Sequence, residues 1–350
     1  MKHLFIDDHG IERLDNLARK LHQPQKFRGN AIVRPEYRWE NLYIRMWGAP
    51  MWDPDAGLFK MIYLGSASKD LTSAGKGAAA ELDETGESGT SGHYSCYATS
   101  EDGVNWEKPF LELYDYPGLN WNGSPIGGQN NILPSITGHL RGPVYHAAET
   151  DPARRFKTQA YRQGNLYTLV SADCVHWEEL DLPPQPSADV SELYLDEVTE
   201  TFISTVKHRG PYGRSFYLST SKDFQNWSEQ ALIFHADQTD QENGAERTQR
   251  FFDDLNYLTP VYNRPEEWRT DVYQFPVFRY EGFYLGLPVM HHWTGKHPPL
   301  YENVDSRKTV ELASSRDLRN WKRVADRAAF MELSPVGDGG AYDTGQIGTT

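Results

Sequence analysis

Three widely separated aspartates are the side chains with the clearest potential for chemistry. Asp189, Asp271 and Asp343 each stand at or beside the start of a segment with strand-like composition. Two carboxyl groups with different pKa values can hydrolyse a glycosidic bond, because one protonates the leaving oxygen while the other acts as base or nucleophile. The competing interpretation is that each aspartate only accepts backbone hydrogen bonds at a strand start. The three are predicted catalytic residues, with the acid and base roles unassigned.

Polar and aromatic side chains near the same strand starts are candidates for binding a sugar, since flat rings stack on the faces of pyranose rings. The predicted substrate-binding residues are Glu40, Trp47, Asn130, Asn131, Glu192, Tyr273, Gln274, His291 and Trp293. The chain contains 10 Trp, 20 Tyr and 15 Phe, and most of these also suit half-buried β-sheet. The aromatic content therefore does not establish a binding site by itself.

The sequence motifs give little indication of metal, nucleotide or serine-hydrolase chemistry. His291 and His292 form an adjacent pair that could bind a metal or transfer protons, but no cysteine or acidic residue stands at ligand spacing. The sequence contains no phosphate-binding loop, dinucleotide fingerprint or Gly-x-Ser-x-Gly motif. No metal and no cofactor are predicted.

Charge and composition limit the class of partner. The chain of 350 residues is 38% hydrophobic and 24% charged, as is typical of a globular protein. Its net charge of -14 argues against binding nucleic acid or an anionic membrane and fits a neutral carbohydrate. No apolar run reaches about 18 residues, so no membrane span is expected. Asp7 and Asp8 interrupt any signal-peptide pattern, which predicts a cytoplasmic protein if this N-terminus is native. The oligomeric state is left open.

One turn motif, Ser-x-Asp-x-x-x-Trp, recurs four times. Its copies end at Trp106, Trp177, Trp227 and Trp321, and each follows a β-rich segment. The Ser and Asp side chains can accept hydrogen bonds from the backbone N–H groups of a tight turn, and the Trp can pack between neighbouring sheets. Four copies that all follow strands predict a repeated antiparallel sheet.

A predicted β-hairpin accompanies each turn, so that each repeat supplies the four strands of a propeller blade. The sequence thus predicts an all-β fold, with residues 1–350 forming a single five-bladed β-propeller domain. Its predicted parts are an N-terminal arm (residues 1–42) and blades at about 43–112, 130–182, 189–235, 271–330 and 339–350. The fifth blade is incomplete: either residues 4–6 help to complete it or the chain ends inside the domain. The one predicted helix covers residues 10–21.

This architecture would bring distant residues together. The first strand of each propeller blade lines the axial channel, so the starts of these strands converge at one mouth. Asp189, Asp271 and Asp343 are therefore predicted to share that mouth. Asp53 and Asp196 lie in hairpin turns at the opposite ends of such strands, where turn formation explains them.

Four segments carry a family resemblance: residues 52–63, 100–106, 151–157 and 278–286. They resemble the glycoside hydrolase propeller superfamily that includes families 32, 43, 68, 117 and 130, with uncharacterised family-32-like bacterial proteins the closest in pattern. The resemblance spans nearly the whole chain and specifies the fold better than the substrate. It implies cleavage of a glycosidic bond in a poly- or oligosaccharide by acidic residues at the propeller mouth.

The chain departs from family 32 at the positions on which that mechanism depends. Families 32 and 68 carry an Asp on the first strand of blade one, in an Asn-Asp-Pro context, whereas residues 43–51 contain no Asp. The Arg-Asp-Pro and Glu-Cys motifs of family 32 are also missing. A non-catalytic carbohydrate-binding propeller is therefore the alternative hypothesis. A glycoside phosphorylase is a third, and it would need a cationic pocket for phosphate. Arg45, Arg269 and Arg279 are the candidates, and the sequence shows no cluster.

Overall fold

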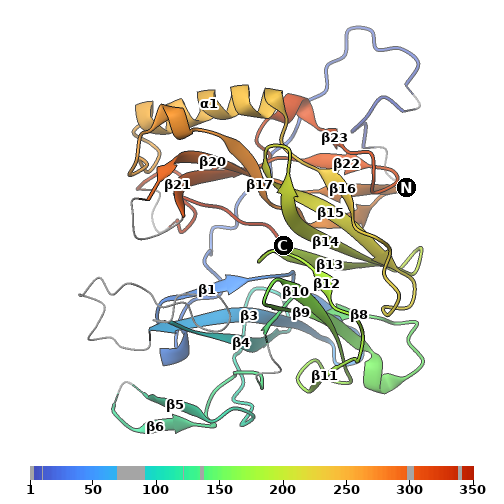
Figure 1. Ribbon diagram of the computed structural model, residues 1–350, viewed down its shortest axis with the longest axis vertical. Helices are drawn as coiled ribbons and strands as arrows, with labels where there is room; N and C mark the ends of the chain where they lie inside the picture. Colours follow the sequence, from blue (N-terminus) through green and yellow to red (C-terminus); the bar gives the residue numbers. More distant parts are fainter. Residues whose placement is uncertain are drawn as a thin grey trace. The chain divides into compact units, whose positions relative to one another are not determined.

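Figure 1 shows the computed structural model of the chain, which describes residues 4–9, 11–68, 91–120, 122–134, 138–297, 303–337 and 341–350. The chain is mostly β-structure, which confirms the predicted fold class at that level. The five-blade arrangement and the single domain stay predictions. Residues 339 and 340, which begin the predicted fifth blade, lie outside the described residues. No helix in the described part of the chain is long and apolar enough to cross a membrane.

The chain divides into two compact units. One contains Ile32–Ile203, the turn Ser221–Trp227 and Thr350, and we name it the 32–203 unit. The other contains Met1–Ala31, Ser204–Thr220 and Ser228–Thr349, and we name it the 204–349 unit. Each is described separately below.

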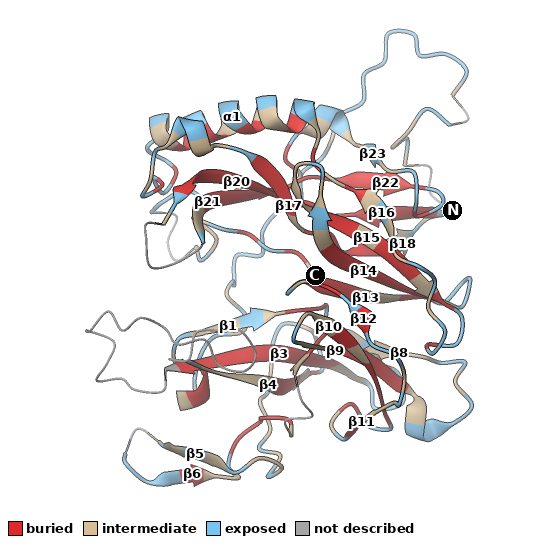
Figure 2. Cartoon of the chain, in the orientation of Figure 1, coloured by how far each residue is buried: buried red, intermediate tan, exposed pale blue. Residues whose placement is uncertain are grey.

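The first sheet of the 32–203 unit is formed by β1 (Tyr43–Met46), β2 (Met51–Asp53), β3 (Leu58–Ser68) and β4 (Ser91–Ser100). β1 and β2 pair antiparallel with different parts of β3, so they behave as one interrupted strand. β4 pairs antiparallel with β3 along their full lengths. β3 is buried along most of its length, as Figure 2 shows, because it lies in the middle of this sheet.

The second sheet of this unit repeats the interruption. It contains β7 (His139–Leu140), β8 (Val144–Tyr145), β9 (Phe156–Arg162), β10 (Asn165–Ser171), β11 (Trp177–Glu179) and β12 (Gln185–Pro186). β7 and β8 pair with β9 at its two ends, in the same way that β1 and β2 pair with β3. The remaining elements are a separate hairpin of β5 (Tyr116–Leu119) and β6 (Pro125–Gly127), and the 3-10 helices Arg38–Glu40 and Pro152–Arg154.

A third sheet has the order β13 (Ser191–Asp196), β14 (Thr201–Gly210), β15 (Gly213–Ser221) and β16 (Ala231–Phe234). The division between the two units falls within β14, after Ile203.

Two further sheets belong to the 204–349 unit. β17 (Thr270–Gln274), β20 (Val289–Lys296) and β21 (Val304–Val310) form one of them. β18 (Val277–Tyr280), β19 (Phe283–Gly286), β22 (Ala313–Ser315) and β23 (Lys322–Arg323) form the other. The strands in both sheets pair antiparallel. The 3-10 helices Pro265–Glu267 and Ala325–Arg327 complete the unit's regular structure together with one α-helix.

The predicted helix at residues 10–21 is wrong, because residues 11–21 have no helical structure. The α-helix among the described residues is instead α1 (Gln238–Asp253). Its start is fixed by a capping box, in which Asp237 accepts from the Asp240 N–H and Asp240 accepts from the Asp237 N–H. Gly244 allows α1 to lie close to β17, since a Cβ there would be 1.9 Å from Oγ1 of Thr270.

The four predicted turns are confirmed as hydrogen-bonded structures. In the turn Ser315–Trp321, Oδ1 of Asp317 accepts the N–H groups of Arg319 and Asn320 at 2.9 and 2.8 Å. Oδ2 of the same aspartate accepts from Nδ2 of Asn320 at 2.6 Å. These bonds hold the pKa of Asp317 below its usual range. The other three turns use an Asn or His at the corresponding position in the same way: Asn105, His176 and Asn226. This repeated residue was not part of the predicted motif.

Replacing Asp317 with Ala should lower the free energy of unfolding by about 1 kcal/mol, because several turn N–H groups lose their acceptor. Thermal or urea unfolding of the full chain measures the change. Arg319→Ala is the matched control, since this neighbouring side chain is exposed and forms no hydrogen bond in the described turn. Equal losses in the two variants would contradict the structural role of the aspartate.

Candidate functional site

Two groups of side chains could do chemistry, one in each unit. The Glu192 cluster of the 32–203 unit contains Tyr43, Arg45, Trp47, Arg141, Tyr161 and Glu192. The Asp271 cluster of the 204–349 unit contains Arg214, Arg269, Asp271, Tyr273, His291 and Trp293.

The Glu192 cluster is positioned by a contact between two backbones. β1 ends before Trp47-Gly48-Ala49-Pro50, and β7 ends before Arg141-Gly142-Pro143. Proline cannot donate to a β-ladder, which favours an interruption at both places. A Cβ on Gly48 would lie 2.3 Å from Cα of Gly142, so only glycine permits this approach. The N–H of Gly142 donates to the carbonyl of Trp47 at 3.3 Å. The side chains of Trp47 and Arg141 are thereby brought together.

Aromatic rings and guanidinium groups alternate in this cluster. Cζ of Arg45 lies 5.1 Å from the ring centres of both Tyr43 and Trp47. Cζ of Arg141 lies 5.0 Å from the ring centre of Trp47 and 5.1 Å from that of Tyr161. Such cation–π contacts hold flat groups in fixed orientations. The three rings and two guanidinium groups form a row against which a sugar ring could stack.

Arg141 is the buried centre of the row, with 1% of its surface exposed. Its Nε donates to Oγ of Ser191 at 3.1 Å, and its Nη2 donates to the backbone carbonyl of Asp189 at 2.6 Å. These two bonds fix the guanidinium against the start of β13, the strand that carries Glu192.

Glu192 has the environment of a proton donor. Only 5% of it is exposed, and its Oε1 has no hydrogen-bond partner in the part of the chain that the structure describes. Burial raises the pKa of Glu192 from 4.5 to about 8, although the charge of Arg141 acts in the opposite direction. The carboxyl group is therefore neutral at pH 7 and can act as a general acid. The sequence predicted Glu192 only as a binding residue, because burial could not be read from its position.

The predicted catalytic residue Asp189 is exposed and lies just before β13. Its backbone carbonyl accepts from Nη2 of Arg141. Its catalytic role stays a prediction.

Three predicted binding residues in this unit have extensive contacts with the protein itself. The carboxylate of Glu40 accepts from Nζ of Lys108 at 2.9 Å and from the hydroxyl of Tyr63. Asn131 donates to the Tyr63 hydroxyl at 2.7 Å, and Asn130 donates to two backbone carbonyls. These contacts give each residue a structural role, and substrate binding by them stays a prediction.

Asp271, on β17, is fully buried and heavily hydrogen-bonded. Its Oδ2 accepts from Nη1 of Arg214 at 3.0 Å and from the Arg214 N–H at 3.3 Å. Gly213 makes this approach possible, because its φ is +108° and a Cβ there would lie 2.9 Å from Oδ2 of Asp271. On the other side, Oδ1 of Asp271 lies 3.0 Å from Nδ1 of His291.

The ionisation states of this pair follow from their surroundings. Burial opposes ionisation of Asp271, but the hydrogen bonds and charges of His291 and Arg214 outweigh it and lower its pKa to about 2. Burial lowers the pKa of His291 to about 4 despite the opposing effect of Asp271. Nδ1 of His291 lies between Oδ1 of Asp271 and Nε1 of Trp293, which is 3.1 Å away, and its Nε2 lies 2.8 Å from Oγ of Ser306. This has the connectivity of a Ser-His-Asp triad, but Ser306 is 1% exposed, so the chain of bonds holds Asp271 in place.

Two aromatic residues of the Asp271 cluster carry cations on their rings. Nζ of Lys308 lies 3.5 Å and Nζ of Lys207 4.4 Å from the ring centre of Tyr273. Arg269 has its Cζ 3.4 Å from the ring centre of Trp293. No cluster of cations is visible in the sequence, whereas the fold brings Lys207, Lys308 and Arg269 onto two aromatic rings here.

Gln274 and Asp343 both hold the C-terminal segment. Oε1 of Gln274 accepts from the Thr349 N–H at 3.3 Å. Burial opposes ionisation of Asp343, but its ion pair with Lys26 and its hydrogen bond with Ser334 outweigh burial and lower its pKa. No described contact joins Asp343 to Asp271, and the catalytic role of Asp343 stays a prediction.

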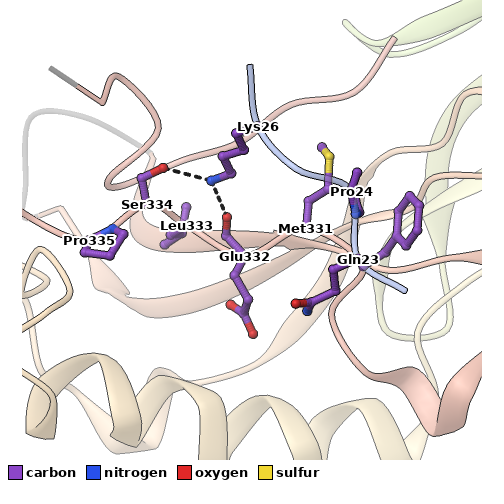
Figure 3. Close-up of a pocket in the computed structure, with 9 residues that line it drawn as sticks. Gln23, Pro24, Lys26, Met331, Glu332, Leu333, Ser334 and Pro335 are labelled. Carbon is purple, nitrogen blue, oxygen red and sulfur yellow. Dashed lines mark hydrogen bonds between the residues drawn. The ribbon is translucent and has the colours of Figure 1, made fainter. Parts of the chain in front are cut away.

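Lys26 also lies beside a hollow of about 220 Å³, where it donates to Oγ of Ser334 and to the carbonyl of Glu332 (Figure 3). The remaining lining residues are mostly apolar: Pro24, Phe330, Met331, Leu333 and Pro335, with Gln23 at the edge. The hollow therefore marks where the N-terminal segment packs on its own unit, and it lacks the paired acids that hydrolysis needs.

Within the described ranges, no group of three or more His, Cys, Asp or Glu residues is placed to hold a metal ion.

Comparisons with known proteins give structural neighbours only. No family model matches the sequence, and no curated protein matches it. The chain is similar to a solved structure described as a glycoside hydrolase, with 14% identity, a TM-score of 0.45, and coverage of 86% of this chain and 78% of that chain. It is also similar to an endo-arabinase from Bacteroides thetaiotaomicron, with 12% identity, a TM-score of 0.40, and coverage of 81% and 80%. A family 117 glycoside hydrolase from Zobellia galactanivorans has 9% identity, a TM-score of 0.41, and coverage of 87% and 74%.

These neighbours are glycoside hydrolases of the propeller type, the group that the sequence was predicted to resemble. Their TM-scores are all below 0.5, so the likeness decides neither the number of blades nor the activity.

The raised pKa of Glu192 predicts a pH-dependent effect on stability. The unfolded chain releases this proton near pH 4.5 and the folded chain near pH 8. Between these values the wild type loses stability as the pH rises, by up to about 1.4 kcal/mol per pH unit. Glu192→Gln avoids this cost, so its melting temperature should exceed that of the wild type at pH 8 and equal it at pH 4.5.

Melting curves of both proteins at pH 4.5, 6 and 8 measure this difference. Glu178→Gln is the control, because this glutamate of the same unit is exposed and should show no such trend. If the melting temperatures of Glu192→Gln and the wild type differ by the same amount at every pH, Glu192 is not neutral in the folded protein.

Proposed function

We propose that this protein is a glycosidase that cleaves a glycosidic bond in a poly- or oligosaccharide, with Glu192 as the general acid. The observation that carries the proposal is the buried, neutral carboxyl group of Glu192 in the same cluster as a row of aromatic rings and guanidinium groups. An acid that keeps its proton at pH 7 can protonate the leaving oxygen, which is the step that limits cleavage of an unactivated glycoside.

The row from Tyr43 to Tyr161 supplies the binding surface in this proposal. Trp47 is central, because it contacts both Arg45 and Arg141. Its Nε1 is buried and has no hydrogen-bond partner among the described residues. Arg141 has a second role, since its charge limits how far burial raises the pKa of Glu192.

Asp189 supplies the second carboxyl group in the proposal. It is exposed and precedes Glu192 by three residues, so it can be reached by water and by substrate. Asp271 is not assigned a reacting role, because its carboxylate is fully buried and committed to Arg214 and His291.

Wild-type protein should release sugars from at least one member of a panel of plant and algal polysaccharides, measured as new reducing ends. Glu192→Gln should lower kcat on that substrate by about 100-fold or more, because general acid catalysis is lost. Glu178→Gln is the matched control and should retain activity. Binding of a polysaccharide by wild type with no sugar release would favour the non-catalytic carbohydrate-binding alternative.

The role of Glu192 as acid, rather than as a structural residue, is tested with two leaving groups. Glu192→Gln should retain most of its activity on a dinitrophenyl glycoside, whose leaving group needs no proton, while losing activity on the natural linkage. Wild-type kcat on the natural linkage should fall above about pH 8 as Glu192 ionises, and the variant should lack this fall. Equal losses on both substrates would contradict the acid assignment.

A further inference from the structure

Two arginines of the 204–349 unit, Arg214 and Arg269, lie beside Trp293, and the charge of Arg209 acts on Arg269. Arg209 is near the end of β14, Arg214 follows in β15, and Arg269 directly precedes β17. The hairpin between β14 and β15 brings the first two together. The carbonyl of Arg269 accepts from the Trp293 N–H at 2.9 Å, which places Arg269 beside β20.

The guanidinium groups of Arg214 and Arg269 both lie near the indole of Trp293. Cζ of Arg269 is 3.4 Å and Cζ of Arg214 is 5.5 Å from its ring centre. A guanidinium stacked on a ring keeps its N–H groups directed outward in its own plane, where they can donate to an oxyanion. Nη1 of Arg214 donates to Asp271, and the side chain of Arg214 is 30% exposed. Arg209 and Arg269 are both exposed, so a ligand can reach this group.

The arginines are close enough to repel one another. Burial lowers the pKa of Arg269, and the charges of Arg214 and Arg209 lower it further, while Asp271 acts in the opposite direction. The carboxylate of Asp271 contacts one of these guanidinium groups, that of Arg214, and its charge acts on that of Arg269. Such a concentration of positive charge is unexpected in a chain with a net charge of -14 unless an anion offsets it.

We propose that Arg209, Arg214 and Arg269 bind the oxyanion of an acidic sugar, such as a uronate carboxylate or a sulfate ester. That the oxyanion belongs to a sugar rests on the proposed function, whereas binding of an oxyanion at these arginines does not. The proposal differs from the expectation of a neutral carbohydrate that followed from the net charge, because the local charge is opposite to the average.

Isothermal titration calorimetry tests the proposal with oligogalacturonate, neutral oligogalactose, inorganic sulfate and inorganic phosphate as separate probes. The wild type should bind oligogalacturonate and not oligogalactose, and salt should weaken the binding. Arg269→Gln should weaken it by about tenfold, the loss expected for one charge-assisted hydrogen bond. Arg264→Gln is the matched control, because Arg264 also lies over an aromatic ring, that of Tyr262, in the same unit.

The probes distinguish the source of the oxyanion. If oligogalacturonate or sulfate binds and Arg269→Gln weakens that binding, the ligand is an acidic sugar. If phosphate alone binds and Arg269→Gln weakens it, the oxyanion site is supported and its ligand is free phosphate. Equal effects of Arg264→Gln and Arg269→Gln, or no anion binding at all, would overturn the proposal. Repeating the titration in Glu192→Gln separates binding from cleavage, since that variant should bind normally whether or not the proposed hydrolysis is correct.

Discussion

The Glu192 cluster depends on the close contact of two backbones at Gly48 and Gly142. Any side chain at either position would separate the two interrupted strands, because a Cβ would overlap the opposite glycine. The contact places Trp47 beside Arg141, and Arg141 in turn is fixed against the start of β13 by Ser191 and the Asp189 carbonyl. The orientation of the cluster therefore originates in backbone geometry, and the side chains add to it.

Two buried carboxyl groups of this chain have opposite ionisation states, and their hydrogen bonds explain the difference. Asp271 accepts three hydrogen bonds from Arg214 and His291, which compensate for the loss of water. Glu192 has one carboxyl oxygen without a partner among the described residues, and the charge of Arg141 is what offsets its burial. Burial alone favours the neutral acid, whereas burial with donors favours the carboxylate. The first environment suits proton donation and the second suits a fixed structural charge.

Local features of the fold could be predicted from the sequence because neighbouring residues produce them. The Ser-x-Asp turns form from hydrogen bonds within seven residues, so their pattern is visible in the chain. The helix was missed for the opposite reason. α1 has few apolar residues, and its start is marked by Asp237 and Asp240, while the more apolar residues 11–21 form no helix. Apolar spacing was the weaker signal here, and the capping box was the stronger one.

The sequence by itself determined the β-rich fold class, the repeated turns and a carbohydrate-related family resemblance, all of which depend on local pattern. Only the tertiary structure decided which acid is neutral, because burial and partners come from distant segments. The same holds for the arginines: Arg209 and Arg214 are adjacent to one hairpin, but Arg269 joins them because Arg214 contacts Asp271, two residues further along the chain on β17. Charge and pKa depend on three-dimensional proximity, which spacing along the chain does not specify.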